Sequence, residues 1–234
     1  MVRVIVAATP LTLAATVVQA GPFEDGVAAY ERGDYASAIG LWHPLAQQGD
    51  AAAQFNIALM YNTGRGVPED KAAAVSWYRL AAEQGYAKAQ FSLGAMYERG
   101  DGVPQDYAEA ARWYRAAAEQ RNARARYKLG YLHHKGKGVQ RDLGEAVKLY
   151  SQAADQGLPE AQFRLGILYA LGEGVQQDYV VAYAWLDLAA ANSPDGAIRA
   201  RAVESRDLLA RKMEPEQISA AKKLAREWKP KVTP

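Results

Sequence analysis

Apolar residues recur along this chain with the spacing of amphipathic helices, and the same pattern returns every 36 residues. In one copy, Ala89, Leu93 and Met96 follow at intervals of four and three residues, which places them on one face of a helix. A second apolar run, with Trp113 and Ala117, follows in the same copy at a similar interval. No segment alternates between apolar and polar residues strongly enough to predict a strand. The pattern therefore predicts an all-α protein in which each copy contributes two helices.

The residues between the two apolar runs carry the signals that end one helix and begin the next. Gly100 stands where a helix commonly ends in the left-handed conformation, which glycine adopts without a Cβ clash. Pro104 prevents the helix from continuing, and Asp106 can accept hydrogen bonds from the free N–H groups at the start of the second helix. Glu109, and Glu145 in the next copy, stand three residues after the capping Asp and predict a capping box.

The repeat keeps its spacing through four copies without an insertion, and several positions hold the same residue each time. These positions are Gly64, Gly100, Gly136 and Gly172; Gly66, Gly102, Gly138 and Gly174; Asp70, Asp106, Asp142 and Asp178; and Ala81, Ala117, Ala153 and Ala189. Because one helix pair of this size cannot bury its apolar face alone, we expect the pairs to stack into a right-handed α-solenoid.

The pattern divides the chain into a leader, a repeat region and two ends. The predicted segments are a signal peptide (1–20), an N-terminal partial repeat (21–50), four repeats (51–86, 87–122, 123–158 and 159–191), a C-terminal helical cap (192–229) and a tail (230–234) that frays from Pro230. We expect the cap because an open solenoid end exposes its apolar face unless a helix with a polar outer side covers it.

The first 20 residues have the composition of a secretory signal peptide. Arg3 precedes an apolar run from Val4 to Val18, and the small-residue spacing that follows predicts cleavage after Ala20. The alternative is a core helix of the folded domain, against which Pro10 and several β-branched residues argue. We therefore expect a periplasmic or secreted protein with no membrane-spanning segment in its mature form.

Composition and charge exclude several classes of function. The chain has 28 Lys and Arg against 26 Asp and Glu, a formal net charge of +2, which is not the balance of a nucleic-acid-binding protein. It has no Cys, so disulfides, thiolate metal sites and a Cys nucleophile are excluded. The Gly-x-Gly pairs follow no strand and precede no Gly-Lys-Ser/Thr, so they do not predict a nucleotide site.

The three His residues do not form a recognisable metal or catalytic site. His133 and His134 are adjacent on a helix and point about 100° apart, so they cannot chelate one ion as a pair spaced by four residues would. We interpret one of these rings as packed in a slot that Tyr fills in other copies and the other as exposed. His43 is interpreted as a helix-surface residue. The sequence therefore predicts no cofactor, no metal and no catalytic residues, hence a protein that is not an enzyme.

The chain resembles the Sel1-like repeat proteins, relatives of the tetratricopeptide solenoids. The resemblance rests on the run from Ala87 to Gln120, which reads AKAQFSLGAMYERGDGVPQDYAEAARWYRAAAEQ. It implies an interaction scaffold, often exported in bacteria, that holds partner proteins or cell-envelope assemblies. Three positions depart from the pattern: Arg121 stands for Gly at the end of the second copy, and Arg126 for Gln and His133 for Tyr in the third copy.

A candidate binding surface follows from the positions that do not repeat. On the first helix of each copy, the variable positions are 52, 56, 59 and 63 and their equivalents 36, 72 and 108 residues further on. Intervals of four, three and four residues place them in one stripe, which we expect on the concave side of the solenoid. The candidate partner-binding residues are Lys88, Ser92, Arg99, Arg124, Lys128, Tyr131, Lys135 and Arg164.

This stripe is basic and carries an aromatic residue, although the whole chain is nearly neutral. A stripe of this kind would attract an acidic protein or peptide. Three alternatives stay open. The stripe is a solvated helix face with no partner; the partner is an anionic envelope polymer such as peptidoglycan or an exopolysaccharide; or the protein is a hydrolase, for which no residue constellation was found.

Overall fold

The computed structural model describes residues 21–231. The predicted signal peptide (1–20) and the end of the predicted tail (232–234) lie outside the described residues. Within residues 21–231 the chain forms twelve α-helices and no strand, which confirms the predicted all-α class. The helices are α1 (Pro22–Glu31), α2 (Tyr35–Gln47), α3 (Ala51–Thr63), α4 (Lys71–Glu83), α5 (Ala87–Arg99), α6 (Tyr107–Glu119), α7 (Ala123–Lys135), α8 (Leu143–Ala154), α9 (Pro159–Leu171), α10 (Tyr179–Asn192), α11 (Gly196–Ala210) and α12 (Pro215–Glu227).

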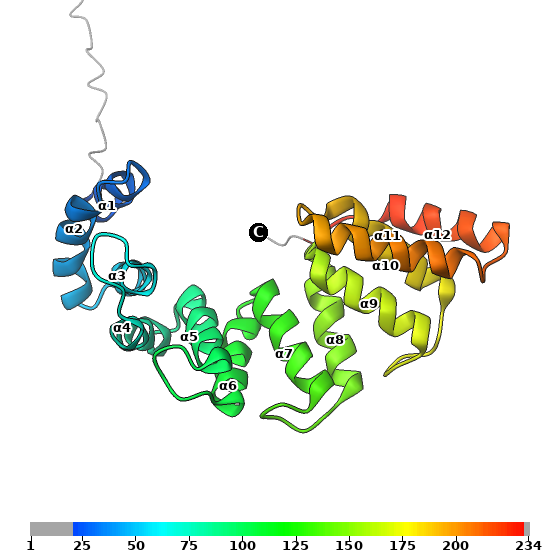
Figure 1. Ribbon diagram of the computed structural model, residues 1–234, viewed down its shortest axis with the longest axis horizontal. Coiled ribbons are helices and arrows are strands. Elements are labelled where there is room, and N and C mark those ends of the chain that lie inside the picture. Colours follow the sequence, from blue (N-terminus) through cyan, green and yellow to red (C-terminus); the bar gives the residue numbers. More distant parts are fainter. Residues whose placement is uncertain (1–20, 232–234) are drawn as a thin grey trace, which may run out of the picture.

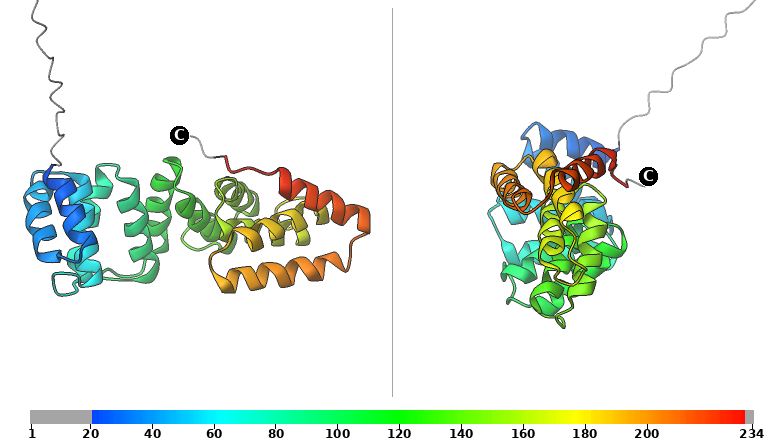
Figure 2. Two further views of the ribbon diagram at one scale, coloured as in Figure 1. Left: turned by 90° about the horizontal axis from the view of Figure 1, so that it is seen from above. Right: turned by 90° about the vertical axis from the view of Figure 1, so that its right-hand side faces the viewer.

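Helices that follow one another in the chain pack side by side and form an open arc (Figure 1). From α1 to α8, the odd-numbered helices lie along the inner side of the arc and the even-numbered helices along its outer side. The last helices gather at one end, where α11 and α12 both pack against α10. Figure 2 shows the same elongated row of helices from above. The arrangement confirms the predicted α-solenoid of stacked helix pairs.

Small residues let the helices approach closely, and one large residue of each repeat fills the space between them. The alanines of the repeated positions are fully buried, and so are Tyr78, Tyr114 and Tyr150, which stand 36 residues apart. Trp77 packs against the apolar clusters on both sides of a repeat boundary. The repeats therefore share one continuous apolar spine, and burying that spine stabilises the stack.

The loop between the two helices of each repeat requires glycine for two separate reasons. Gly138 adopts φ of +67°, a conformation that residues with a Cβ disfavour. A Cβ at this position would also collide with the main chain of Tyr107 and Ala108, at the start of the preceding repeat's second helix. The same close approach recurs between Gly102 and Lys71. The repeated glycine therefore fixes the contact between one loop and the neighbouring repeat.

The predicted Asp caps are present, but the predicted capping boxes are wrong. The Asp106 side chain accepts hydrogen bonds from the backbone N–H groups at the start of α6, and Asp142 does the same for α8. The Asp106 N–H, which a capping box would use, donates instead to the carbonyl of Tyr97 at 3.0 Å. The Glu109 side chain is therefore free to pair with Arg112, at 2.8 Å. In the same way, Glu145 pairs with Lys148 at 3.0 Å and does not cap α8.

Arg121 is the one described residue other than glycine with a positive φ, at +64°. The equivalent positions of the neighbouring copies hold Gly85 and Gly157, both at φ of +86°. The departure from the repeat pattern at Arg121 therefore leaves the backbone path unchanged. It places a side chain in a left-handed conformation that costs about 1 kcal/mol.

The second departure, Arg126, removes a hydrogen bond between the two halves of one repeat. In the second repeat, Gln90 accepts a 2.8 Å hydrogen bond from the side-chain amide of Gln120. Arg126 takes the place of Gln90 in the third repeat, and a guanidinium has no acceptor atom. Gln156, the counterpart of Gln120, bonds to a carbonyl within its own helix instead. The third repeat thus lacks one internal polar contact that the second repeat has.

The C-terminal helices close the end of the solenoid. Trp228, which follows α12, packs edge-on against Trp185 of α10 with ring centroids 6.1 Å apart. Beyond it, Lys231 contacts Asp155 at the end of α8 twice, through its backbone N–H at 2.7 Å and through its Nζ at 2.8 Å. Within the predicted tail, Lys231 thus contacts the end of α8. No helix in the described part of the chain is long and apolar enough to cross a bilayer.

Candidate protein-binding surface

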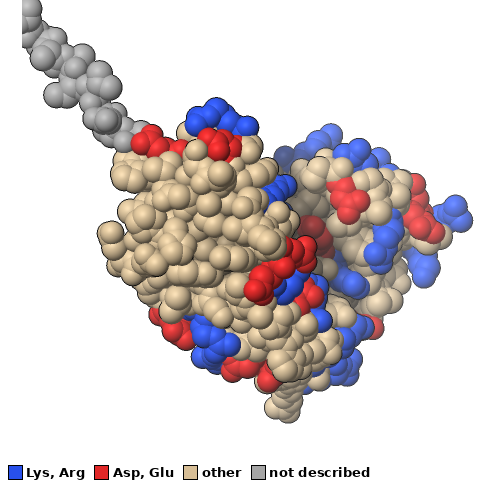
Figure 3. All heavy atoms as spheres, turned by 60° about the vertical axis from the view of Figure 1, so that its left-hand side comes forward, with Lys and Arg blue, Asp and Glu red and all other residues tan. Residues whose placement is uncertain are grey.

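The free face of the odd-numbered helices lines the hollow of the arc. Other faces of these helices are buried against neighbouring helices, and the stripe predicted from the variable positions contains both exposed and half-buried residues, with Ala95 buried. Lys88, Arg99, Arg124 and Lys135 are exposed, while the remaining candidate residues, Ser92, Lys128, Tyr131 and Arg164, are half-buried. Figure 3 shows that charged side chains are sparse over the N-terminal helices and gather around the hollow.

Lys128, one of the candidate residues, is already paired within the protein. Its Nζ lies 3.0 Å from Glu98 Oε2, whose side chain is 14 % exposed. The buried hydroxyl of Tyr114 donates a 2.5 Å hydrogen bond to the same carboxylate. Burial and the neighbouring Glu98 both raise the pKa of Tyr114, so the hydroxyl keeps its proton. We call this set, which joins α5, α6 and α7, the Glu98 junction.

Three further candidate residues also have partners inside the protein. Arg99 pairs with Asp101 at 2.6 Å, at the exposed end of α5. Ser92 lies close to Tyr78, whose pKa burial raises to about 12. Tyr131 packs its ring against two apolar clusters. Tyr131 therefore contributes to the packing between helices, whereas Arg99 is neutralised by a residue just after its own helix. Both residues are only partly available to a partner.

Three cations of the stripe remain exposed and form no ion pair within residues 21–231: Lys88, Arg124 and Lys135. We call them the inner basic row. They come from α5 and from both ends of α7. Because they form no ion pair with a carboxylate of the described residues, their charges are available to attract an acidic partner.

The last candidate residue, Arg164, belongs to a second junction whose composition differs. His134, Tyr150 and Arg164 stand 36 residues after Glu98, Tyr114 and Lys128, respectively. His134 takes the place of the glutamate and meets Tyr150 edge-on, with ring centroids 6.5 Å apart. The hydroxyl of Tyr150 is fully buried and has no hydrogen-bond partner in the described structure. We call this set the His134 junction.

The His134 junction is electrostatically positive. Burial lowers the pKa of His134, and Lys135, Arg164 and Arg141 lower it further by repulsion, against the opposing effect of Glu173. The His134 side chain is 14 % exposed. The expectation that one ring of the His pair is exposed is therefore wrong, because His134 faces Tyr150 and the next repeat. His133 stands in the Tyr slot, where its Nδ1 is buried without a partner.

The candidate residues predicted from the sequence did not include Glu98 and Tyr114, because both lie outside the variable positions that define the stripe. Lys128 and Glu98 are 30 residues apart and meet only when two repeats stack. A signal was nevertheless present in the aligned copies. His134 stands in the third copy where Glu98 stands in the second, while Tyr150 matches Tyr114. The comparison of the two copies therefore indicates a site without its carboxylate.

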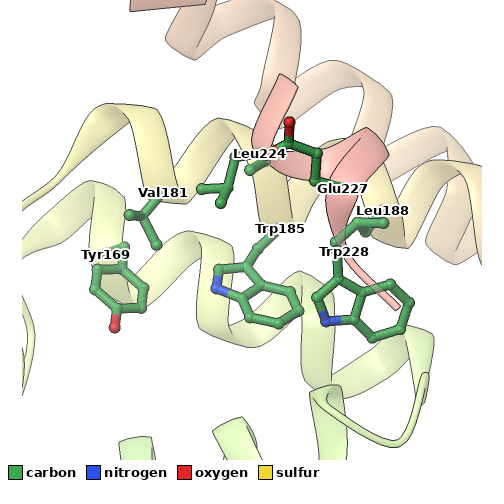
Figure 4. Close-up of a pocket in the computed structure, with 8 residues that line it drawn as sticks. Tyr169, Val181, Trp185, Leu188, Leu224, Glu227 and Trp228 are labelled. Atoms are coloured by element: carbon green, nitrogen blue, oxygen red, sulfur yellow. The ribbon is translucent and has the colours of Figure 1, made fainter. Parts of the chain in front are cut away.

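Two further cavities lie elsewhere on the molecule. An apolar pocket of about 380 Å³ lies between α9, α10 and α12, lined by Tyr169, Trp185 and Leu224 among others (Figure 4). Its charged lining residue is Glu227, at the edge of the C-terminal cap. A more polar groove of about 480 Å³ lies between α6, α7 and α8 and includes His133. No group of three or more His, Asp or Glu suited to a metal occurs in the described residues.

The 36-residue helix pair with its glycine loop is a family signature. A model of the Sel1 repeat matches residues 51–86, 87–122, 123–158 and 159–194 of the chain. The chain belongs to the Sel1 repeat family. Sel1 repeats generally mediate protein–protein interaction, and their fold is typically a non-catalytic scaffold.

Two solved structures resemble this Sel1 repeat protein in sequence and in fold. The protective antigen c5321 of uropathogenic Escherichia coli strains is 34% identical, with a TM-score of 0.80 over 88% of this chain and 44% of its own. A Sel1 repeat protein from Oxalobacter formigenes is also 34% identical, with a TM-score of 0.71 over 86% of this chain and 84% of its own. The chain thus spans less than half the length of the Escherichia coli antigen. No curated protein sequence matches it.

Proposed function

We propose that this Sel1 repeat protein is an interaction scaffold of the cell envelope, which binds an acidic protein or peptide along the inner side of its arc. The observation that carries the proposal is the inner basic row, Lys88, Arg124 and Lys135, exposed and unpaired within the described residues. Opposite charge on a partner would steer it into the hollow and hold it there.

The outer side of the arc supports the same assignment by contrast. There, Arg112 pairs with Glu109 at 2.8 Å and Lys148 pairs with Glu145 at 3.0 Å, each within one helix. Such pairs neutralise the surface locally and are worth little to stability. These two ion pairs thus compensate cations of the outer helices, while the inner basic row is left uncompensated.

The second part of the proposal is that the protein is exported from the cytoplasm. The leader residues 1–20 carry the pattern of a secretory signal peptide, and the absence of Cys is compatible with a fold held by stacked repeats without disulfides. A periplasmic or secreted location would bring the inner basic row into contact with envelope proteins. Fractionation of cells that express the full chain tests this part, because export predicts cleavage after Ala20 and recovery outside the cytoplasm.

Charge reversal on matched faces tests the binding surface. One variant carries Lys88→Glu, Arg124→Glu and Lys135→Glu on the inner face, and its control carries Arg112→Glu, Arg115→Glu and Lys148→Glu on the outer helices. Both should unfold near the same urea concentration as the wild type. The inner variant should lose at least about tenfold in partner capture, and the outer control should not.

The nature of the partner is decided by the same capture with and without prior digestion of envelope glycans. A protein partner stays bound after digestion and is released as salt rises. Capture that disappears on glycan digestion would instead assign the inner face to an anionic envelope polymer. Equal capture by the wild type and the inner variant would contradict the proposal.

A further inference from the structure

We propose that the His134 junction is a binding site for a carboxylate of the acidic partner, held by the Tyr150 hydroxyl and the Arg164 guanidinium. This inference rests on the proposed function, because it places one acidic side chain of the partner at a defined position on the inner face. The Glu98 junction, one repeat earlier, is the equivalent site in which a carboxylate of the protein itself is bound.

The Glu98 junction shows how the fold binds a carboxylate at this position. Glu98 receives a hydrogen bond from the Tyr114 hydroxyl at 2.5 Å and an ion pair from Lys128 at 3.0 Å. The three groups come from three successive helices, α5, α6 and α7, so that the carboxylate joins two repeats. A hydrogen bond from a buried phenol to a charged acceptor is among the stronger polar contacts in proteins.

The His134 junction keeps the donor and the cation but lacks the acceptor. Tyr150 matches Tyr114 and is 0% exposed, yet its hydroxyl has no hydrogen-bond partner among residues 21–231. Arg164 matches Lys128 and makes no ion pair among the described residues, while acting electrostatically on both His134 and Tyr150. A buried hydroxyl left without an acceptor costs free energy, which a bound carboxylate would recover.

The nearby acidic side chains do not fill this place. Glu173, in the loop after α9, lies 4.0 Å from His134 Nε2 and is 44% exposed. Glu160, one turn before Arg164 on α9, forms no ion pair with it in the described structure, and its Oε2 is buried without a partner. Neither one bonds to the Tyr150 hydroxyl.

The other two junctions show that an unsatisfied hydroxyl is not a general feature of the repeat. At the junction before, the Tyr78 hydroxyl is not among the buried polar atoms that lack a hydrogen-bond partner in the described structure. At the junction after, the corresponding residue is Leu186, which has no polar atom to satisfy. Among the four equivalent positions of the described chain, Tyr150 alone combines a buried hydroxyl with no acceptor.

The chemistry of the site selects a carboxylate on a flexible chain. The side chain of Glu98 is the internal template, and an Asp or Glu of a peptide lying along the inner side can present the same group. The His134 ring meets the Tyr150 ring edge-on, and no side-chain hydrogen bond holds His134 within the described residues. A rotation of the His134 side chain would therefore break no side-chain hydrogen bond.

Three single substitutions test the site with a fluorescent, N-acetylated hexaglutamate peptide as the probe and hexaglutamine as its neutral control. His134→Glu supplies the missing carboxylate from within and should weaken hexaglutamate binding at least about tenfold. Tyr150→Phe removes the donor and should weaken binding several-fold. Tyr114→Phe makes the same change in the filled junction and should leave binding as in the wild type.

Each outcome decides a different point. Wild-type affinity for hexaglutamate in both His134→Glu and Tyr150→Phe would overturn the site. Equal weakening by Tyr114→Phe and Tyr150→Phe, or equal binding of hexaglutamate and hexaglutamine by the wild type, would also overturn it. If the Arg124→Glu, Lys135→Glu variant loses the peptide while His134→Glu retains it, this site is wrong and the proposed inner binding face stands. Capture of the natural partner by the inner charge-reversal variant would refute the proposed function itself.

Discussion

The hydroxyl of Tyr114 donates a 2.5 Å hydrogen bond to Glu98, across the boundary between two helices of one repeat. The same carboxylate pairs with Lys128 of the next repeat, so one acid joins two repeats and satisfies a buried phenol. Thirty-six residues further on, Tyr150 occupies the same place without an acceptor. The two tyrosines thus provide a matched pair in which the same substitution has different consequences.

Replacing Tyr114 by Phe should destabilise the protein by about 2 kcal/mol, because it removes a hydrogen bond to a charged group that is largely buried. Replacing Tyr150 by Phe should change stability by less than about 0.5 kcal/mol or raise it, because no hydrogen bond is lost and a buried polar atom is removed. Urea unfolding of both variants measures the difference. Equal destabilisation by the two changes would show that the Tyr150 hydroxyl has a partner.

The acid sensitivity of the fold should depend on His134. Burial first, and then the cations Lys135, Arg164 and Arg141, lower the pKa of His134 below its ordinary value of 6.5, while Glu173 opposes them. Below about pH 6.5 the unfolded chain therefore takes up a proton that the folded chain does not, and stability falls as the pH drops toward the folded-state pKa.

His134→Gln removes this proton uptake. The loss of unfolding free energy between pH 7.5 and about pH 5.5 should therefore be smaller in the variant than in the wild type. Urea unfolding at the two pH values measures it. An identical loss in both proteins would show that His134 titrates alike in the folded and unfolded chains.

Gly138→Ala should destabilise the protein by about 3 kcal/mol, since it combines a left-handed backbone with a collision against the preceding repeat. Gly40 provides the control, because it lies inside α2, where an added Cβ would meet no atom within 4 Å. Gly40→Ala should stabilise by about 0.5–1 kcal/mol through helix propensity. Chemical unfolding of both variants decides whether the loop glycine fixes the repeat contact.

Arg121→Gly should stabilise the protein by about 1 kcal/mol, because it relieves the left-handed conformation that Arg121 adopts at φ of +64°. Arg121→Ala is the matched control: it removes the same side chain but keeps a Cβ, so it should bring no comparable gain. Thermal or urea unfolding of both variants tests the point. A gain of the same size from alanine would assign the effect to the Arg side chain.

The fold could be predicted from the sequence because the 36-residue spacing is kept in all four copies of the repeat. The glycines, the capping Asp residues and the buried alanines each repeat at 36 residues, and each has one physical reason to stand there. The capping boxes failed because the N–H of Asp106 bonds to a carbonyl nine residues earlier, a contact between the two helices of a repeat. No pattern within one helix contains that information.

The sequence predicted which residues form the binding stripe, but not which of them form ion pairs within the protein. Periodicity places Lys128 on the open face, and the structure agrees, but it also places Glu98 within 3.0 Å. That contact depends on how two repeats stack, which the spacing within a helix does not determine. The exposed and unpaired members, Lys88, Arg124 and Lys135, are the part of the stripe that carries the proposal.

Site-specific photo-crosslinking in cells tests the inner face most directly. A photoreactive amino acid is placed at Arg124 on the inner helix α7 in one strain and at Lys148 on the outer helix α8 in another, both exposed positions in the same repeat. We predict one dominant crosslinked partner from position 124, lost when Lys88 and Lys135 are reversed to Glu, and none from position 148. The same partner crosslinked from position 148, with none from 124, would contradict the account.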